Sequence, residues 1–136
     1  MVFMLMKGIM MENCKDVVNR VGVYFNLHKH VFSVVSRQSE NYGKVMCHTP
    51  HIVLYNVTPR VGEKGRLRVI KEQRKNVHAR LFADTFNIPD IIPEAVGREV
   101  TYNPYLYSTF VYKDTLEEFK GCDMMVCVGK RLFEMN

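Results

Sequence analysis

The sequence predicts an α+β domain with a mainly antiparallel, twisted sheet and one principal basic helix at about residues 63–75. Short runs rich in β-branched and aromatic residues recur between turn residues, as in a meander of strands. Only residues 63–75 combine strong helix formers with helical spacing of their apolar side chains. The 136 residues are enough for one domain, and no repeat, low-complexity segment or linker divides them.

The first third of the chain predicts three or four strands. Residues 22–36, GVYFNLHKHVFSVVS, predict a strand or a bent pair of strands. SENYG then predicts a turn, and KVMCH and HIVLYNV predict two strands joined around Thr49-Pro50. We expect Thr58-Pro59 to end the last strand, because proline cannot donate a hydrogen bond to a continuing ladder.

Residues 63–75 are the strongest helix prediction. Leu67, Ile70 and Arg74 recur at i, i+3 and i+7, a narrow seam that ends on the arginine stem. Gly62 is the expected N-cap and Asn76 the expected helix end.

The second half predicts more strands. VHARLFADTF, residues 77–86, alternates apolar and polar side chains and predicts a strand that returns to the sheet. NIPDIIPEAVG contains two prolines and cannot be one regular element. REVTY, STFVY and MMVCVG predict strands, and the polar DTLEEFKGC between them has room for a helical turn.

The N-terminal residues 1–20 predict a Met-rich extension in front of a single ligand-binding domain, residues 21–136. Five of the nine methionines fall within the first eleven residues. The apolar stretch is broken at Lys7 and has neither the basic start nor the cleavage site of a signal peptide. We expect Met10 or Met11 to be the true start, and the alternative is a short arm that packs on a partner.

Positive charge is concentrated between Arg60 and Arg80. Eight Lys or Arg there face two Glu, a net charge of +6, whereas the whole chain carries +5. A basic surface favours nucleotides, nucleic acids or other anions as ligands. No apolar run reaches the roughly 18 residues of a membrane span.

Four cations of the predicted helix share one stripe, with Lys64 and Arg68 followed by Lys71 and Lys75. Like charges at this spacing repel one another weakly, so the stripe is favourable where phosphates lie against it. A plain solvated face is the alternative. Arg66 and Arg74 lie nearer the seam, where a guanidinium can clamp a phosphate through two hydrogen bonds.

TYNPYLY, residues 101–107, is the second candidate site. Its Asn-Pro pair predicts a turn that projects Tyr102 and Tyr105 as platforms for a base, while Asn103 reads the base edge or a ribose hydroxyl. A tyrosine-rich turn that covers the core is the alternative. His78 lies near the helix end, placed to hydrogen-bond a ligand or a backbone carbonyl.

Catalytic and metal-binding patterns are missing from the sequence. It has no Gly-rich phosphate loop, no G-x-S-x-G and no H-E-x-x-H. His28 and His30 share a strand face and His48 and His51 bracket a proline, but no third metal ligand follows at a suitable spacing. The four scattered cysteines predict reduced thiols. We therefore expect a binding protein without catalytic residues, metal or cofactor.

Four stretches in order resemble one known family: NLHKHVFSV (residues 26–34), GRLRV (65–69), RKNVHA (74–79) and VTYNPY (100–105). They resemble the small bacteriophage proteins known as Thoeris anti-defence proteins, in particular the first family described. The resemblance implies a cytoplasmic homo-oligomer in an infected bacterium. It would bind a cyclic ADP-ribose signal of the glycocyclic type without cleaving it, and some members also bind cyclic oligonucleotides between subunits.

The resemblance also implies particular ligand contacts. Arg68 and Asn103 would touch the ligand, and Phe82 or Phe86 would stack on its adenine; Lys130 and Arg131 are the candidates for late basic contacts. The predicted ligand-binding residues are together Arg66, Arg68, Arg74, Lys75, Asn76, His78, Phe82, Phe86, Tyr102, Asn103 and Tyr105. A nucleic-acid-binding phage or host regulator, an enzyme acting on nucleotides and a purely structural protein remain the alternatives.

Overall fold

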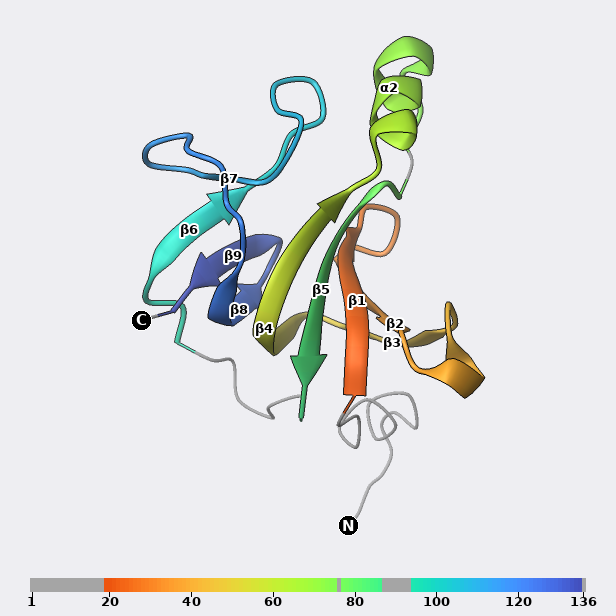
Figure 1. Cartoon of the computed structure of the whole chain (residues 1–136), viewed down its shortest axis with the longest axis vertical. Helices are drawn as coiled ribbons and strands as arrows, with labels where there is room; N and C mark the ends of the chain where they lie inside the picture. The colour runs from red at the N-terminus through yellow and green to blue at the C-terminus, as the bar shows by residue number, and fades with distance from the viewer. Residues whose placement is uncertain (1–18, 76, 87–93, 136) are drawn as a thin grey trace.

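The computed structural model describes residues 19–75, 77–86 and 94–135. Within these ranges nine strands form one sheet in the order β3-β2-β1-β5-β4-β8-β9-β6-β7, and all their pairings are antiparallel. Figure 1 shows the strong twist of this sheet, with one helix, α2, standing at its end. The prediction of a mainly antiparallel α+β fold with a single helix is therefore confirmed.

The first strands form the predicted bent pair. β1 (Asn19–Asn26) and β2 (Val31–Ser36) are a hairpin, followed by the short 3-10 helix η1 (Ser39–Asn41) and by β3 (Val45–Thr49). Asn26 stabilises the hairpin turn, because its Oδ1 accepts the backbone N–H groups of residues 28 and 29 at 3.0 and 2.9 Å. The NLHKH stretch is thus explained by local turn chemistry.

β4 (His51–Val61) pairs with β5 on one side and with β8 on the other. The prediction that Thr58-Pro59 ends this strand is wrong. The pairing with β8 stops at Val57, whereas the pairing with β5 continues through Pro59 to Val61. One edge of β4 is therefore open at the proline, and a missing N–H is tolerated at such an edge.

Helix α2 (Glu63–Glu72) ends three residues before the predicted end at residue 75. Gly62 occupies the predicted N-cap position. Gln73 ends the helix in a left-handed conformation, and its N–H donates to the carbonyl oxygen of Val69 at 2.8 Å. Asn76, the expected helix end, lies outside the described residues.

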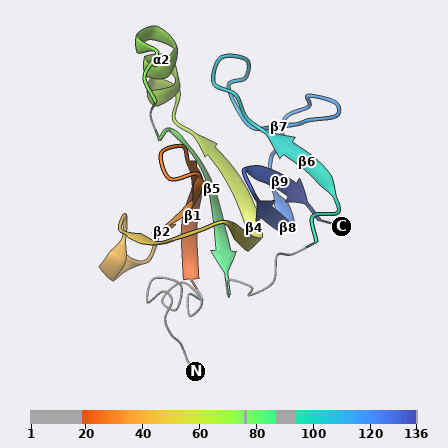
Figure 2. The ribbon, with the colours of Figure 1, turned by 180° about the vertical axis from the view of Figure 1, so that it is seen from behind.

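The buried face of α2 is not the predicted seam. Val69 is 5% exposed, whereas Leu67 is 51% and Ile70 is 36% exposed. Figures 1 and 2 show the reason: α2 stands beyond the ends of β4 and β5 instead of lying across the sheet. Its apolar seam therefore meets no layer of the same subunit within the described residues.

The remaining strands are β5 (Ala79–Thr85), β6 (Arg98–Thr101), β7 (Val111–Tyr112), β8 (Cys122–Val128) and β9 (Arg131–Glu134). The strand predictions over β5, β6 and β8 are confirmed, and that over STFVY is confirmed for two residues. β9 was not predicted, because RLFE is too short to show a clear alternation. The segment between β7 and β8 forms turns without a helix.

The core lies on one face of the sheet. In β5, Leu81 and Ala83 are buried on that face, while Arg80 and Phe82 alternate to the other side. We call this other side of β1, β5 and β4 the outer face. Most of the core is a single apolar cluster, and buried members from most strands of the sheet contribute to it.

Two further findings concern cysteines and membranes. Cys47 is disulfide-bonded, so the prediction of reduced thiols is wrong at this position, while Cys122 and Cys127 are free. Within the described residues, helices fall short of the length and apolar character that a membrane crossing requires.

Candidate functional site

A hollow of about 370 Å³ opens where the end of β4, the first turn of α2 and the start of β5 meet. We call it the sheet hollow. It brings two guanidinium groups, an imidazole and an aromatic ring together, and none of its lining residues is acidic. The lining residues are Arg60, Gly62, Gly65, Val77, His78, Arg80 and Phe82.

Phe82 occupies the middle of the outer face, opposite Gly22 on β1 and Thr58 on β4. A Cβ atom at Gly22 would lie 3.3 Å from the Phe82 ring, closer than such contacts usually are, so the glycine leaves space for the ring. The guanidinium carbon of Arg37 lies 3.8 Å from the centre of the ring, and that of Arg60 lies 5.8 Å away. Two cations therefore approach one aromatic ring.

Arg37 follows β2 and reaches Phe82 from the far side of β1. Its Nε is buried and has no hydrogen-bond partner within the described residues. A buried donor without a partner costs about 1–3 kcal/mol. Its backbone N–H donates to the carbonyl oxygen of Arg20 at 3.0 Å, so the base of the side chain is fixed.

Arg37, Arg60 and Arg80 form no ion pair with an acidic side chain within the described residues. The ion pairs formed within the described residues involve other cations. Arg80 instead lies over the ring of Tyr24 at 5.3 Å. The outer face thus carries several arginines and the carboxylate of Asp84, which accepts a hydrogen bond from Asn56 at 3.0 Å and pairs with none of these three arginines. Such an excess of positive charge favours an added anion.

His78 connects the sheet hollow to the loop of residues 102–110. Its Nε2 lies 2.6 Å from the hydroxyl oxygen of Tyr102, whose ring packs against that of Phe110 with centres 5.1 Å apart. Burial raises the pKa of Tyr102 to about 12, so its hydroxyl is neutral at physiological pH. Tyr102 is a half-buried support and does not project as the predicted stacking platform.

Arg66 fastens α2 to the same loop. Its Nε donates to the carbonyl oxygens of Pro104 at 3.1 Å and Tyr107 at 2.8 Å, and its Nη1 lies 3.5 Å from Oε1 of Glu63. The side chain is only 17% exposed. These partners are protein carbonyls in place of the predicted phosphate, so in this structure Arg66 positions the loop beside the helix.

Asn103 begins the predicted turn, which the structure confirms. Its Oδ1 accepts the N–H of Tyr105 at 2.9 Å, and its carbonyl oxygen accepts the N–H groups of Leu106 and Tyr107 at 3.0 and 2.9 Å. Its amide oxygen is therefore used within the turn. Tyr105 is 56% exposed at the turn and keeps its ring available for a partner.

Three other predicted residues gather at the C-terminal end of α2. Arg68, Arg74 and Lys75 line a second hollow of about 360 Å³ together with Glu72. We call it the helix-end hollow. Arg74 Nη1 lies 3.5 Å from Oε1 of Glu72, and Lys75 lies beyond the end of the helix. The predicted set is thus divided between two hollows.

The remaining predicted residues lie away from the sheet hollow. Phe86 follows the opposite end of β5 and packs on Tyr55 with ring centres 5.1 Å apart, so only Phe82 of the two candidates lines the hollow. Arg131 pairs with Glu99 at 2.7 Å, and Lys130 precedes it in the turn between β8 and β9.

Sequence reasoning missed Arg37, Arg60 and Arg80 as candidate contacts. The alternation of β5 could have placed Arg80 beside Phe82, because residues two apart in a strand share a face. Arg60 could have been found in the same way had β4 been continued through its proline. Arg37 gave no local signal, because the register of β1 and β2 brings it to Phe82.

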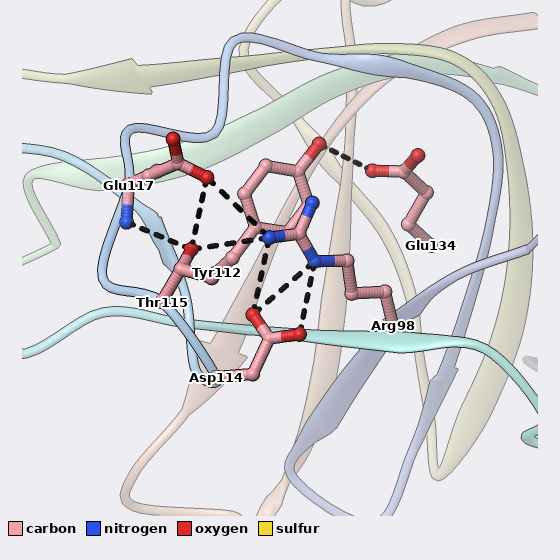
Figure 3. A network of polar contacts seen from close by, with 6 residues as sticks. All are labelled: Arg98, Tyr112, Asp114, Thr115, Glu117 and Glu134. Atoms are coloured by element: carbon pink, nitrogen blue, oxygen red, sulfur yellow. Dashed lines mark hydrogen bonds and ion pairs between the residues drawn. The ribbon is translucent and has the colours of Figure 1, made fainter.

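Arg98 on β6, towards the other edge of the sheet, has acidic partners (Figure 3). Arg98 Nε donates to both carboxylate oxygens of Asp114 at 3.2 Å, and its Nη2 lies 3.6 Å from Oε1 of Glu117. Its guanidinium carbon lies 3.7 Å from the centre of the Tyr112 ring. The Tyr112 hydroxyl donates to Oε1 of Glu134 at 2.6 Å, and this hydrogen bond raises the pKa of Tyr112 to about 12.

No group of three or more His, Cys, Asp or Glu side chains that could hold a metal ion occurs within the described parts of the chain. The chemistry that the sheet hollow offers is therefore that of guanidinium groups, one imidazole and one aromatic ring. Guanidinium groups suit phosphates, and an aromatic ring suits a nucleobase.

The comparisons with known proteins identify the family. The chain matches the family model described as Mycobacterium phage L5 gene 82 protein over residues 2–135. It is 34% identical over 110 residues to the Gene 82 protein of Mycobacterium phage L5, covering 76% of this chain and 86% of that protein. No solved structure matches. The chain therefore belongs to the bacteriophage family of the Mycobacterium phage L5 gene 82 protein.

Proposed function

We propose that this protein sequesters a cyclic ADP-ribose signalling nucleotide, of the glycocyclic type, and so blocks Thoeris immunity in the infected bacterium. One observation carries this proposal: the sheet hollow combines Phe82 with Arg60 and Arg80 and has no acidic lining residue. The chain belongs to a bacteriophage family, and anti-defence proteins are encoded by bacteriophages. The order of the four sequence stretches that resemble Thoeris anti-defence proteins supports it too.

The ligand has parts that match the residues of the sheet hollow. Its adenine is a flat ring, which can stack on Phe82 for roughly 1–3 kcal/mol. Its pyrophosphate carries two negative charges, and Arg60 and Arg80 lie opposite each other on β4 and β5. His78 lines the hollow at its edge and can contact a ribose hydroxyl, while Tyr102 holds its ring in place.

Capture without cleavage fits the residues of this site. Breaking a pyrophosphate or a ribosyl bond calls for a positioned acid or base, and frequently for a metal held by carboxylates. The lining residues include no carboxylate, and Nε2 of His78 is already bonded to the Tyr102 hydroxyl. We therefore propose a binding protein and not an enzyme.

A second copy of the chain would complete the site. Nanomolar capture corresponds to about 12 kcal/mol, which a small ligand reaches only when it is nearly enclosed. Two elements that adjoin the sheet hollow carry exposed apolar side chains: Leu67 lies on α2, and Leu106 (67% exposed) with Tyr105 lies on the loop that Arg66 and His78 contact. We propose that they are buried between subunits. Cyclic oligonucleotides are proposed as second ligands of the oligomer.

The direct test identifies what the protein retains. Purified protein is mixed with glycocyclic ADP-ribose, separated from unbound ligand and denatured by heat. The mass of the released compound is then determined by mass spectrometry. We expect the original mass, in about stoichiometric amount and without loss over time. Release of AMP or ADP-ribose would show an enzyme, and an empty wild-type protein would overturn the proposal.

A nucleic-acid-binding regulator is the second candidate function. It is favoured by the helix-end hollow, where Arg68, Arg74 and Lys75 face a single acid, Glu72. Duplex DNA binding weakens steeply with salt, with a slope of about −0.9 per phosphate contact. A ligand with two phosphates gives a shallow dependence. Micromolar, strongly salt-sensitive binding to random duplex DNA would therefore favour this second function.

A further inference from the structure

The position of Arg37 raises a question about how a base could reach Phe82. The Arg37 guanidinium carbon lies 3.8 Å from the centre of the ring, close to the contact distance of a stacked group. In the ligand-free protein the guanidinium therefore lies against the ring on which we propose that an adenine stacks. Arg37 is outside the lining of the sheet hollow and approaches Phe82 from the direction of β1.

The head of Arg37 has few protein contacts that would hold it in this place. Its Nε is buried without a hydrogen-bond partner, and no ion pair within the described residues includes Arg37. The backbone is fixed by the bond from its N–H to the Arg20 carbonyl oxygen. Arg37 is thus a long side chain with an anchored base and donors that lack an acceptor.

We propose that Arg37 is a specificity-determining residue of the nucleotide site. Its guanidinium covers Phe82 in the free protein, yields the ring to an adenine, and then donates to a phosphate oxygen of the same ligand. The inference rests on the proposed function and adds a selection rule to it. A ligand that bears both a base and phosphates compensates the free-energy cost of moving Arg37 off the ring, because its phosphate then binds Arg37. A base alone offers no such compensation.

This selection rule distinguishes the expected effect of substituting Arg37 from the effect of substituting a residue that only supports the fold. Removing a supporting side chain would weaken every ligand by a similar factor. Removing a side chain that covers the ring and also binds phosphate has opposite effects on two ligands. A neutral nucleoside gains access to Phe82, and a nucleoside diphosphate loses a charge-assisted hydrogen bond.

The test uses adenosine and ADP as probes on the full-length protein, with binding followed by ligand-observed NMR and by calorimetry. In Arg37→Ala we expect adenosine to bind more tightly than in the wild type and ADP to bind at least about tenfold more weakly. Arg37→Lys keeps a positive charge and should recover part of the ADP affinity. Arg20→Ala is the matched control, because Arg20 is an exposed arginine of β1 that also lies on the outer face. In this variant the affinities for adenosine and for ADP should each stay within about twofold of the wild type.

The outcomes separate this inference from the proposed function. If adenosine and ADP weaken by the same factor in both Arg37 variants, or if neither changes, Arg37 has no selective role. Capture of glycocyclic ADP-ribose by the wild type would then still support the sponge. If instead the opposite shifts appear but no cyclic ADP-ribose isomer is retained, the nucleotide site stands and the sponge function falls.

Discussion

Two arginines of this protein lie over aromatic rings at nearly the same distance but differ in their other partners. The guanidinium carbon of Arg98 is 3.7 Å from the ring of Tyr112, and that of Arg37 is 3.8 Å from the ring of Phe82. Arg98 also bonds the carboxylate of Asp114, whereas Nε of Arg37 has no partner within the described residues. The ring contact is therefore shared, and the carboxylates make the difference.

This difference in acidic partners suggests a role in stability for the region around Arg98 and a role in binding for the outer face. Asp114 and Glu117 pair with the guanidinium group of Arg98. These contacts join β6 and β7 with the neighbouring turn, and Tyr112 joins them with β9. The Arg98 hydrogen bond also keeps the pKa of Asp114 below its usual value. On the outer face Arg37, Arg60 and Arg80 form no ion pair within the described residues, and we propose that their donors bind an added anion. We expect substitutions in the first region to change stability and those in the second to change binding.

The largest effect is expected for Tyr112→Ala. This change removes a ring that packs against Phe119 and carries Arg98, together with the hydrogen bond to Glu134. Losing a large partly buried side chain and such a bond should cost about 2–4 kcal/mol of unfolding free energy. Denaturant unfolding measures it, and a cost below about 1 kcal/mol would show that this network contributes little to the fold.

Phe82→Ala should instead weaken ligand capture. We expect a loss of roughly 1–3 kcal/mol of binding free energy for the nucleotide, measured by calorimetry, because the base loses its stacking partner. Phe86→Ala is the matched control, since that ring packs on Tyr55 away from the sheet hollow. Equal losses of affinity in the two variants would contradict the placement of the site.

The two regions should also differ in their response to pH. The hydrogen bond from Arg131 holds the pKa of Glu99 below its ordinary value of 4.5, so this pair stabilises the protein above that pH and loses its effect as pH falls further. The raised pKa of Tyr112 has the opposite effect on the pH dependence of stability. Its contribution to the free energy of unfolding is present below about pH 10 and is lost as the pH rises to about 12.

Unfolding titrations would measure both losses of stability. Glu99→Gln should abolish the loss at acid pH, and Tyr112→Phe should abolish the loss at alkaline pH.

Guanidinium groups, such as those of the outer face, are charged at all these pH values. Nucleotide affinity should therefore change little between pH 5 and pH 8 when measured on folded protein. A steep change of affinity there would contradict binding that depends on the guanidinium groups.

The smallest effect is expected on the stability of Arg80→Gln. Arg80 has no ion pair within the described residues, and the substitution removes only its contact over the Tyr24 ring at 5.3 Å, so the unfolding free energy should change by less than about 1 kcal/mol. Arg98→Gln should lower the thermal midpoint visibly, because two acids lose their partner. A reversed order of the two variants would contradict the comparison.

The sequence predicted the class of fold because local signals determine it here. Alternation in β5 and the bent pair of strands within residues 22–36 depend on neighbouring residues, and both appear as expected. The errors arose where the tertiary structure decides. Pro59 stays in a strand because β8 ends beside it, and Leu67 is exposed because α2 extends past the sheet.

The candidate site could be predicted only in part for the same reason. His78 and Phe82 lie close in sequence and share the sheet hollow, so a local motif could find them. Arg66 and Asn103 have the right chemistry but satisfy backbone groups of the loop beside α2. Arg37 reaches Phe82 through the pairing of β1 with two other strands, which no local pattern reveals.

Thermal unfolding with increasing glycocyclic ADP-ribose tests the central claim most directly, in wild type, Arg80→Gln and Arg98→Gln. A ligand at 100 times its dissociation constant adds about 2.7 kcal/mol of stability. We predict this gain for the wild type and for Arg98→Gln, whatever its starting stability, and its loss in Arg80→Gln. An equal gain in Arg80→Gln, or its disappearance in Arg98→Gln, would contradict the assignment of ligand binding to the arginines that lack carboxylates.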